Sequence, residues 1–190
     1  MSRTVVCYGD SNTWGYTPGS GVRFDEKTRW TGRLQTLLGK EYRVAEKALG
    51  EEYLVLEEGL SGRTTVFSDP LHECMSGLDV IYSTLMSHEP VDLLIISLGT
   101  NDLKYGTVYR SAKGLDALLD VAVHANTYMP GSSPVYRDEP RILVISPIAL
   151  HEELDRKFPG HEMNGKLDDS RKFAAVYREV CQKWQVYFLD

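Results

Sequence analysis

Five short runs of mostly apolar residues, separated by stretches with helical spacing, constrain the fold of this chain more than any other feature. The runs cover Thr4–Tyr8, Tyr53–Glu57, Asp92–Leu98, Arg141–Ser146 and Val186–Leu189. Nearly continuous Val, Ile and Leu, without alternating polar residues, is typical of parallel strands that are covered on both faces. Because strand-like and helical stretches alternate, the sequence predicts a doubly wound α/β fold around one parallel sheet.

The stretches between the runs carry apolar residues at every third or fourth position, which predicts helices. One helix is predicted to begin at Pro70 with Asp69 as its N-cap, because Asp is favoured at the N-cap and Pro at the first helical position. Two later helices are predicted around Leu115–Val123 and Phe173–Trp184. The apolar stripe of the helix predicted from Pro70 consists of Leu71, Cys74, Met75, Leu78, Tyr82, Leu85 and Met86.

A short internal similarity complicates the region before the second run. Leu38–Val44 and Leu49–Val55 share Leu, Gly, Glu, Tyr and Val, but their period is too short for a solenoid. One interpretation is a single helix over Gly32–Leu49 that ends at Gly50. The other makes the first copy a helix end and a strand at Tyr42–Ala45, with the second copy inserted. The apolar stripe of the single helix would be Leu34, Leu37, Leu38, Ala45, Ala48 and Leu49.

Chain length and composition predict one domain. The chain has 190 residues, of which 42% are hydrophobic, and a chain of this size buries a full core without further support. The Pro-, Gly- and Ser-rich segment Thr127–Pro140 is too short to link two domains, so we expect a loop there. Residues 1–190 are therefore predicted to form a single domain.

Charge and apolar patterning exclude several classes of partner and site. Acidic residues number 27 and basic ones 21, which gives a net charge of −6, so nucleic acid and anionic membranes are not expected partners. No apolar run reaches the roughly 20 residues of a membrane span, and the N-terminus enters a strand-like run at once, so a cytoplasmic location is expected. Cys7, Cys74 and Cys181 lack paired spacing, and no metal-ligand motif is present, so neither a disulfide framework nor a metal is expected.

Residues that can carry chemistry follow the first three apolar runs. The turns are Gly9–Gly15, Glu58–Thr65 and Gly99–Asp102. The carboxyl ends of parallel strands meet at one edge of the sheet, where ligands bind in doubly wound folds. A Ser in such a turn can be a nucleophile, and Gly allows backbone N–H groups to approach a reacting oxygen. Each turn alone is ordinary helix-cap chemistry, but the ordered set of three predicts a site.

The set also resembles a known family. The stretches CYGDSNTWGY, RWTG, LVLEEGLSGRTT, DLLIISLGTND and VYFLD are similar to those of the SGNH (GDSL-type) hydrolases, and most closely to the small bacterial arylesterase/acyltransferase branch. This resemblance implies a three-layer, flavodoxin-like sheet with strand order 2-1-3-4-5. It implies a serine esterase or acyltransferase that acts on small acyl esters without a cofactor.

The resemblance assigns roles to residues of the three turns. Ser11 matches the family's nucleophile. The N–H groups of Ser11 and Gly62 and the side-chain amide of Asn101 match its oxyanion hole, which stabilises the negative charge that develops when an ester carbonyl is attacked.

Three neighbouring residues are candidates for supporting roles. Asp10 is expected to hold the first turn rather than to take part in the chemistry. Trp14 and Arg63 are candidates for the mouth of the site, although Trp14 could equally be a packed core aromatic.

The family's catalytic Asp and His lie in an Asp-x-x-His motif after the fifth strand, and neither this motif nor the family's last helix is found in the chain. A Ser without a base is a weak nucleophile. His151 is the least unfavourable substitute, because it follows the fourth strand on the catalytic side. Asp69 and His72 have the right spacing, but Asp69 is better explained as an N-cap. His88 and His124 are expected away from this edge of the sheet, and His161, in the same connection as His151, is expected in a solvated loop.

The expected consequences are low esterase activity for residues 1–190 and exposed apolar surface that favours self-association. Three alternatives remain open at this level. They are a carbohydrate deacetylase on the same scaffold, an inactive fragment or rearranged esterase, and a flavodoxin-like module whose first loop binds phosphate through Ser11, Thr13 and loop amides.

Overall fold

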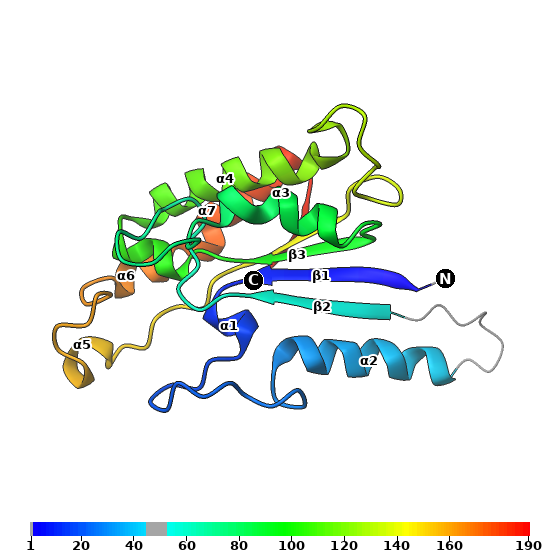
Figure 1. The fold of residues 1–190 in the computed structure, drawn as a ribbon. Helices are drawn as coiled ribbons and strands as arrows, with labels where there is room; N and C mark the ends of the chain where they lie inside the picture. Colours follow the sequence, from blue (N-terminus) through cyan, green and yellow to red (C-terminus); the bar gives the residue numbers. More distant parts are fainter. Residues whose placement is uncertain (1, 45–52) are drawn as a thin grey trace.

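The computed structural model describes residues 2–44 and 53–190, which form a five-stranded sheet with helices on both faces (Figure 1). The order is β2-β1-β3-β4-β5, and every neighbouring pair is parallel. The predicted fold class, strand order and five strands are confirmed, with strand ends that differ by one or two residues. The strands are β1 (Arg3–Gly9), β2 (Tyr53–Gly59), β3 (Leu93–Ser97), β4 (Ile142–Ile145) and β5 (Tyr187–Leu189).

Helices of unequal number cover the two faces. Figure 1 shows α3, α4 and α7 on one side of the sheet and α2 on the other. These helices are α2 (Trp30–Val44), α3 (Gly77–Ser87), α4 (Val108–Val123) and α7 (Phe173–Trp184). The shorter ones are α1 (Ser11–Trp14), α5 (Leu154–Lys157) and α6 (Leu167–Ser170), with 3₁₀ turns η1 (Thr100–Lys104) and η2 (Ala125–Thr127). In the part of the chain that is described, no helix has the length and apolarity needed to cross a membrane.

The two faces of the sheet differ in how fully they are buried. Successive strand residues point to opposite faces, so Val6 and Tyr8 enter the large core under α3, α4 and α7, whereas Val5 and Cys7 face α2. On the α2 side the packing is thinner toward β5, where Tyr187 is 68% exposed. The large core therefore covers one face of β1, β3 and β4, and the smaller cluster under α2 covers the other.

The start of α3 differs from the sequence-based prediction. The helix begins at Gly77 and not at Pro70. The Asp69 carboxylate accepts the N–H of Leu71 at 2.7 Å, a local turn that competes with helix formation. Cys74 then adopts a left-handed φ of 61°, which no helix can continue through, and Leu71 is exposed.

The other predicted helices are confirmed in outline. α7 occupies its predicted range, and α4 contains the predicted Leu115–Val123 but begins earlier, at Val108. α2 continues to Val44, so Tyr42–Val44 is helical and not a strand, while the remainder of the expected helix, 45–49, lies outside the described residues. Leu34 and Leu38 pack on the sheet, but Leu37, predicted on the same stripe, is 58% exposed.

Thr127–Pro140 is mostly irregular, as predicted, yet its end is anchored in the fold. Val91 donates its N–H to the Val135 carbonyl at 2.8 Å, and Arg137 donates to the Val91 carbonyl at 3.0 Å. Val135 and Tyr136 are buried. The loop thus packs beside the amino end of β3 rather than leading away from the sheet.

Candidate active site

The first turn presents Ser11 at the end of the central strand β1. The buried carboxylate of Asp10 accepts the backbone N–H of Asn12 at 2.9 Å and caps α1. Burial raises the pKa of Asp10 to about 6, against the hydrogen bonds from Asn12, which lower it. Ser11 is the first residue of α1 and is partly exposed, and its hydroxyl has no hydrogen-bond partner within residues 2–44 and 53–190. Asp10 therefore fixes the turn, and the Ser11 hydroxyl remains available to a ligand.

The second turn is tied to the first through Arg63. Leu60 donates its N–H to the Gly9 carbonyl at 3.1 Å, and Nη1 of Arg63 donates to the same carbonyl at 3.1 Å and to that of Glu58. The guanidinium lies 4.3 Å from the ring centre of Tyr8. Arg63 was expected at the mouth, but it is only 6% exposed. It is buried beneath the turn because its charge is used on main-chain carbonyls.

The third turn brings Asn101 to the second. Asn101 lies in η1, is buried, and donates from Nδ2 to the Arg63 carbonyl at 3.0 Å. An amide nitrogen carries two hydrogens, and no second partner for this one is found among the described residues. Gly62, next to Arg63, has a left-handed φ of 92°, and its N–H donates to no described group. Two donors from different strands therefore flank Arg63 and can bind an oxygen that carries negative charge.

Register explains why the three turns meet. Gly9 pairs with Gly59 of β2 and with Ser97 of β3, so the turns leave the sheet at the same level. Ser11, Gly62 and Asn101 follow these paired positions by only a few residues. The sequence-based expectation that they share one edge of the sheet agrees with this geometry.

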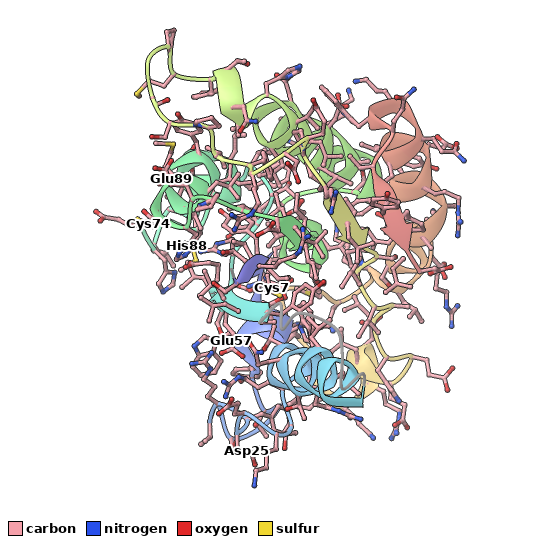
Figure 2. All side chains as sticks on the ribbon, turned by 90° about the vertical axis from the view of Figure 1, so that its right-hand side faces the viewer. Cys7, Asp25, Glu57, Cys74, His88 and Glu89 are labelled. Carbon is pink, nitrogen blue, oxygen red and sulfur yellow. The ribbon has the colours of Figure 1, made fainter. Side chains whose placement is uncertain are left out.

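Trp14 lies at the rim of this edge. It belongs to neither core, and Nε of Arg23 donates to its carbonyl at 2.7 Å while the guanidinium lies 5.5 Å from its ring centre. Arg23 and Arg29 both donate to the Glu57 carboxylate at 2.8 Å, and Thr31 donates to it as well. Burial would raise the pKa of Glu57, but these donors and charges outweigh it and lower the pKa. Glu57, labelled in Figure 2, is thus the hub that holds the segment between α1 and α2.

Sequence reasoning missed a second carboxylate hub, Asp102. This fully buried side chain accepts the Thr65 N–H at 2.8 Å, the Thr65 hydroxyl at 2.5 Å and the Ser111 hydroxyl at 2.6 Å. Burial raises the pKa of Asp102 to about 6, although the hydrogen bonds from Ser111 and Thr65 lower it. A Ser inside the apolar stripe of the following helix was the available signal, since a buried hydroxyl needs a polar partner.

A small pocket adjoins the turn that carries Ser11. It has a volume of about 280 Å³ and is mostly apolar. The pocket lies at the carboxyl ends of β1, β3 and β4, and the residues on either side of Ser11, though not Ser11 itself, line it. Its lining includes Asp10, Asn12, Trp30, Thr100, Ile145 and Pro147.

No histidine contacts Ser11 within the described residues. His72 pairs with Asp69 at 3.2 Å on the surface, and His88 reaches Glu58 at 2.7 Å. His151, the candidate base, is exposed, and its Nδ1 accepts a backbone N–H two residues along at 3.2 Å. His124 and His161 likewise bond within their own segments. The described residues therefore bring two N–H donors to the sheet edge where Ser11 lies, but none of their histidines contacts Ser11.

The cysteines do not form a second reactive centre in the described residues. Cys7 and Cys181 are buried, and burial raises their pKa values to about 12 and about 11, with the charge of Glu57 adding to the rise at Cys7. Cys74 is free and exposed. Over residues 2–44 and 53–190 no group of three or more His, Cys, Asp or Glu side chains is arranged to hold a metal ion.

Comparisons with known proteins identify a family and solved structures with the same fold. The family model of the GDSL-like lipase/acylhydrolase family matches residues 7–190. Est24, a carbohydrate acetylesterase from Sinorhizobium meliloti, is 32% identical with a TM-score of 0.82, over 98% of this chain and 83% of its own. An aryl esterase of M. smegmatis is 31% identical with a TM-score of 0.81, over 99% of this chain and 83% of its own. A search of curated proteins finds no match.

Proposed function

The chain belongs to the GDSL-like lipase/acylhydrolase family of serine ester hydrolases, and from this premise we propose that it hydrolyses small acyl esters through an acyl intermediate on Ser11. One observation carries the proposal: the Asn101 amide is held at 3.0 Å from the Arg63 carbonyl, beside Gly62 and at the same sheet edge as Ser11. A side-chain amide and a backbone N–H at the sheet edge of a serine support an oxyanion site of the kind that acyl transfer needs.

The chemistry follows from these groups. The Ser11 oxygen attacks the ester carbonyl, its hydroxyl proton passes to water because no described histidine contacts it, and the carbonyl electron pair moves onto oxygen; the departing alkoxide takes up a proton from water. The N–H groups of Ser11 and Gly62 and the second N–H of Asn101 stabilise that oxyanion, each by roughly 3 kcal/mol of barrier. Collapse expels the alcohol and leaves acyl-Ser11. Water, or a second alcohol in acyl transfer, then attacks the acyl carbon and restores the serine.

Substrate size is inferred from the pocket and from the relatives. A pocket of about 280 Å³, lined by the neighbours of Ser11, Asp10 and Asn12, lies at the small end of ligand pockets and favours a small substrate. The aryl esterase supports an aryl ester as substrate. Est24 favours a second candidate, deacetylation of a carbohydrate. Cytoplasmic location and self-association through exposed apolar surface remain predictions.

Variants at Ser11 and Asn101 test the proposal with p-nitrophenyl acetate as substrate. Ser11→Ala should abolish turnover and labelling by a fluorophosphonate probe. Asn101→Ala should lower kcat by roughly a hundredfold or more, because one oxyanion donor is lost. Asn126→Ala, which removes an amide that accepts the Tyr136 N–H at 2.8 Å, should leave kcat unchanged.

The outcomes separate the candidates. Probe labelling at another serine, or full turnover by Ser11→Ala, contradicts the proposal. Faster release of acetate from an acetylated sugar than from the aryl ester would select the carbohydrate deacetylase.

A further inference from the structure

We propose that Asp102 is a positioning residue. It sets the distance between the Gly62 N–H and the Asn101 amide by joining the turns that carry these two oxyanion donors. The proposal rests on the proposed function, because those donors matter only if an oxyanion forms beside Ser11. Asp102 itself contacts no reacting atom. It acts through its neighbour Asn101 and through the turn that contains Gly62.

The carboxylate bridges two turns that leave different strands. Asp102 directly follows Asn101 in η1, whereas Thr65 lies three residues after Gly62. Thr65 donates twice to the carboxylate, from its N–H at 2.8 Å and from its hydroxyl at 2.5 Å. The Asn101 amide, at 3.0 Å from the Arg63 carbonyl, closes the same gap from the other side. The two turns are thus joined at two places, with the Gly62 N–H beside one of them.

Two helices hold the carboxylate itself. Ser111 of α4 donates to it at 2.6 Å, and Tyr177 of α7 lies 2.7 Å from the Ser111 hydroxyl and donates to the Leu98 carbonyl at 3.1 Å. All of these side chains are buried. Gly114, three residues after Ser111, leaves room for the approach, because a Cβ there would lie 1.9 Å from the Thr65 hydroxyl. The helical layer is therefore shaped to fix this one carboxylate.

The contact works through geometry rather than through charge. Every donor to Asp102 is a neutral N–H or O–H group, and the carboxylate forms no ion pair with any described residue. Two of the three donors are hydroxyls, which can rotate and accept instead. An Asn at this position can therefore accept from the Thr65 N–H through its oxygen and donate to the hydroxyls through its nitrogen. An Ala can do neither.

This difference defines the experiment. Kinetics with p-nitrophenyl acetate, normalised to the folded fraction measured by circular dichroism, should show that Asp102→Ala lowers kcat tenfold or more with KM within threefold. Asp102→Asn should restore kcat to within threefold of the parent. If Asp102→Ala does not fold, Ser111→Ala replaces it in the experiment. This variant removes a single donor, so it should fold and should lower kcat about threefold.

A matched control separates positioning from stability. Asp92 is also a buried carboxylate, at the opposite end of the sheet, where it accepts the Thr4 N–H and Nε of Arg137, both at 2.8 Å. Asp92→Ala should be destabilised but should keep the kcat of its folded fraction. An equal loss of kcat in Asp92→Ala and Asp102→Ala, or no rescue by Asp102→Asn, would overturn the proposal.

A second readout does not depend on turnover. In ¹⁵N spectra, Asp102→Ala should shift or broaden the Gly62 amide and the Asn101 side-chain amide, and Asp92→Ala should leave both in place. Unchanged signals in Asp102→Ala refute the positioning role. If the parent protein shows no Ser11-dependent turnover while these signals do change, the proposed function fails and the positioning role of Asp102 stands.

Discussion

The two carboxylates that hold the site, Asp102 and Glu57, do so in opposite surroundings. Asp102 is fully buried, accepts only from neutral donors, and has a pKa raised to about 6 by burial. Glu57 is partly exposed and faces Arg23 and Arg29, whose hydrogen bonds and charges lower its pKa despite some burial. The first carboxylate joins the turn of Asn101 to the turn of Gly62 through Thr65, and the second holds the segment between α1 and α2.

The contrast shows how burial changes what a carboxylate can contribute. Inside the large core, donors that lose their acceptor have no water to replace it, so the loss is large. At the rim, water hydrates a guanidinium whose partner is removed, and the loss is small. The core hub should therefore be sensitive to hydrogen-bond geometry and to pH, and the rim hub to salt.

The largest effect should separate Asp102→Ala from Glu57→Ala. Asp102→Ala leaves two hydroxyls and one N–H buried without an acceptor, and should lower the free energy of unfolding by about 3 to 5 kcal/mol. Glu57→Ala should lower it by about 1 kcal/mol. Urea denaturation of both variants beside the parent measures the difference. Equal losses would remove the distinction between the two hubs.

The next effect is the pH dependence of stability. Asp102 and Asp10 have pKa values raised from 3.8 to about 6 in the folded protein, so the folded state binds more protons between these values. Stability should therefore fall as pH rises from about 4 to about 6, by on the order of 2 kcal/mol for each carboxyl group. The pKa of Glu57 is lowered in the folded protein. Its carboxylate therefore adds stability at pH values above its unfolded pKa, and this stability is lost as the pH falls through the folded pKa.

Denaturation at several pH values checks this. Asp102→Asn should flatten the slope between pH 4 and 6, whereas Glu57→Gln should leave that slope in place and weaken the loss at lower pH. A slope that Asp102→Asn does not change would show that Asp102 is ionised equally in both states.

The smallest effect concerns salt at the rim. Glu57→Gln keeps the shape of the side chain but removes its charge, and should cost about 0.5 to 1 kcal/mol at low ionic strength. The difference from the parent should shrink when salt is raised to about 1 M, because exposed charges are screened. A matching test of Asp102→Asn should show little salt dependence. Salt sensitivity at Asp102 greater than at Glu57 would reverse the comparison.

The sequence predicted the fold well where local and tertiary signals agree. The runs at β1 and β3 are mostly apolar because both faces are covered, so parallel strands followed directly, whereas the strand order came from the family resemblance. The predicted start of α3 at Pro70 was wrong because the Asp69 carboxylate forms a local turn with Leu71. Asp and Pro together are as compatible with a turn as with a helix start.

The site was predicted in part. The strand ends indicated Ser11, Gly62 and Asn101, because paired positions bring these turns to one edge. Arg63 was misplaced at the mouth, since no local pattern shows that its guanidinium is used on buried carbonyls. The Asp102 hub depends on α4 and α7 packing against the turns, and the only local signal, Ser111 inside the apolar stripe of α4, does not identify which carboxylate it meets.

The placement of the strands also decides which part of the molecule opens first. β5 is a three-residue edge strand whose Tyr187 and Leu189 are 68% and 52% exposed, so its amides should exchange with solvent through small local openings. β1 lies inside the sheet, and Val5, Val6, Cys7 and Tyr8 are each at most 1% exposed, so its amides should exchange only through global unfolding. The Ser11 turn extends from that slow-exchanging strand. Fraying at β5 can therefore proceed many times a second without disturbing the geometry around the nucleophile.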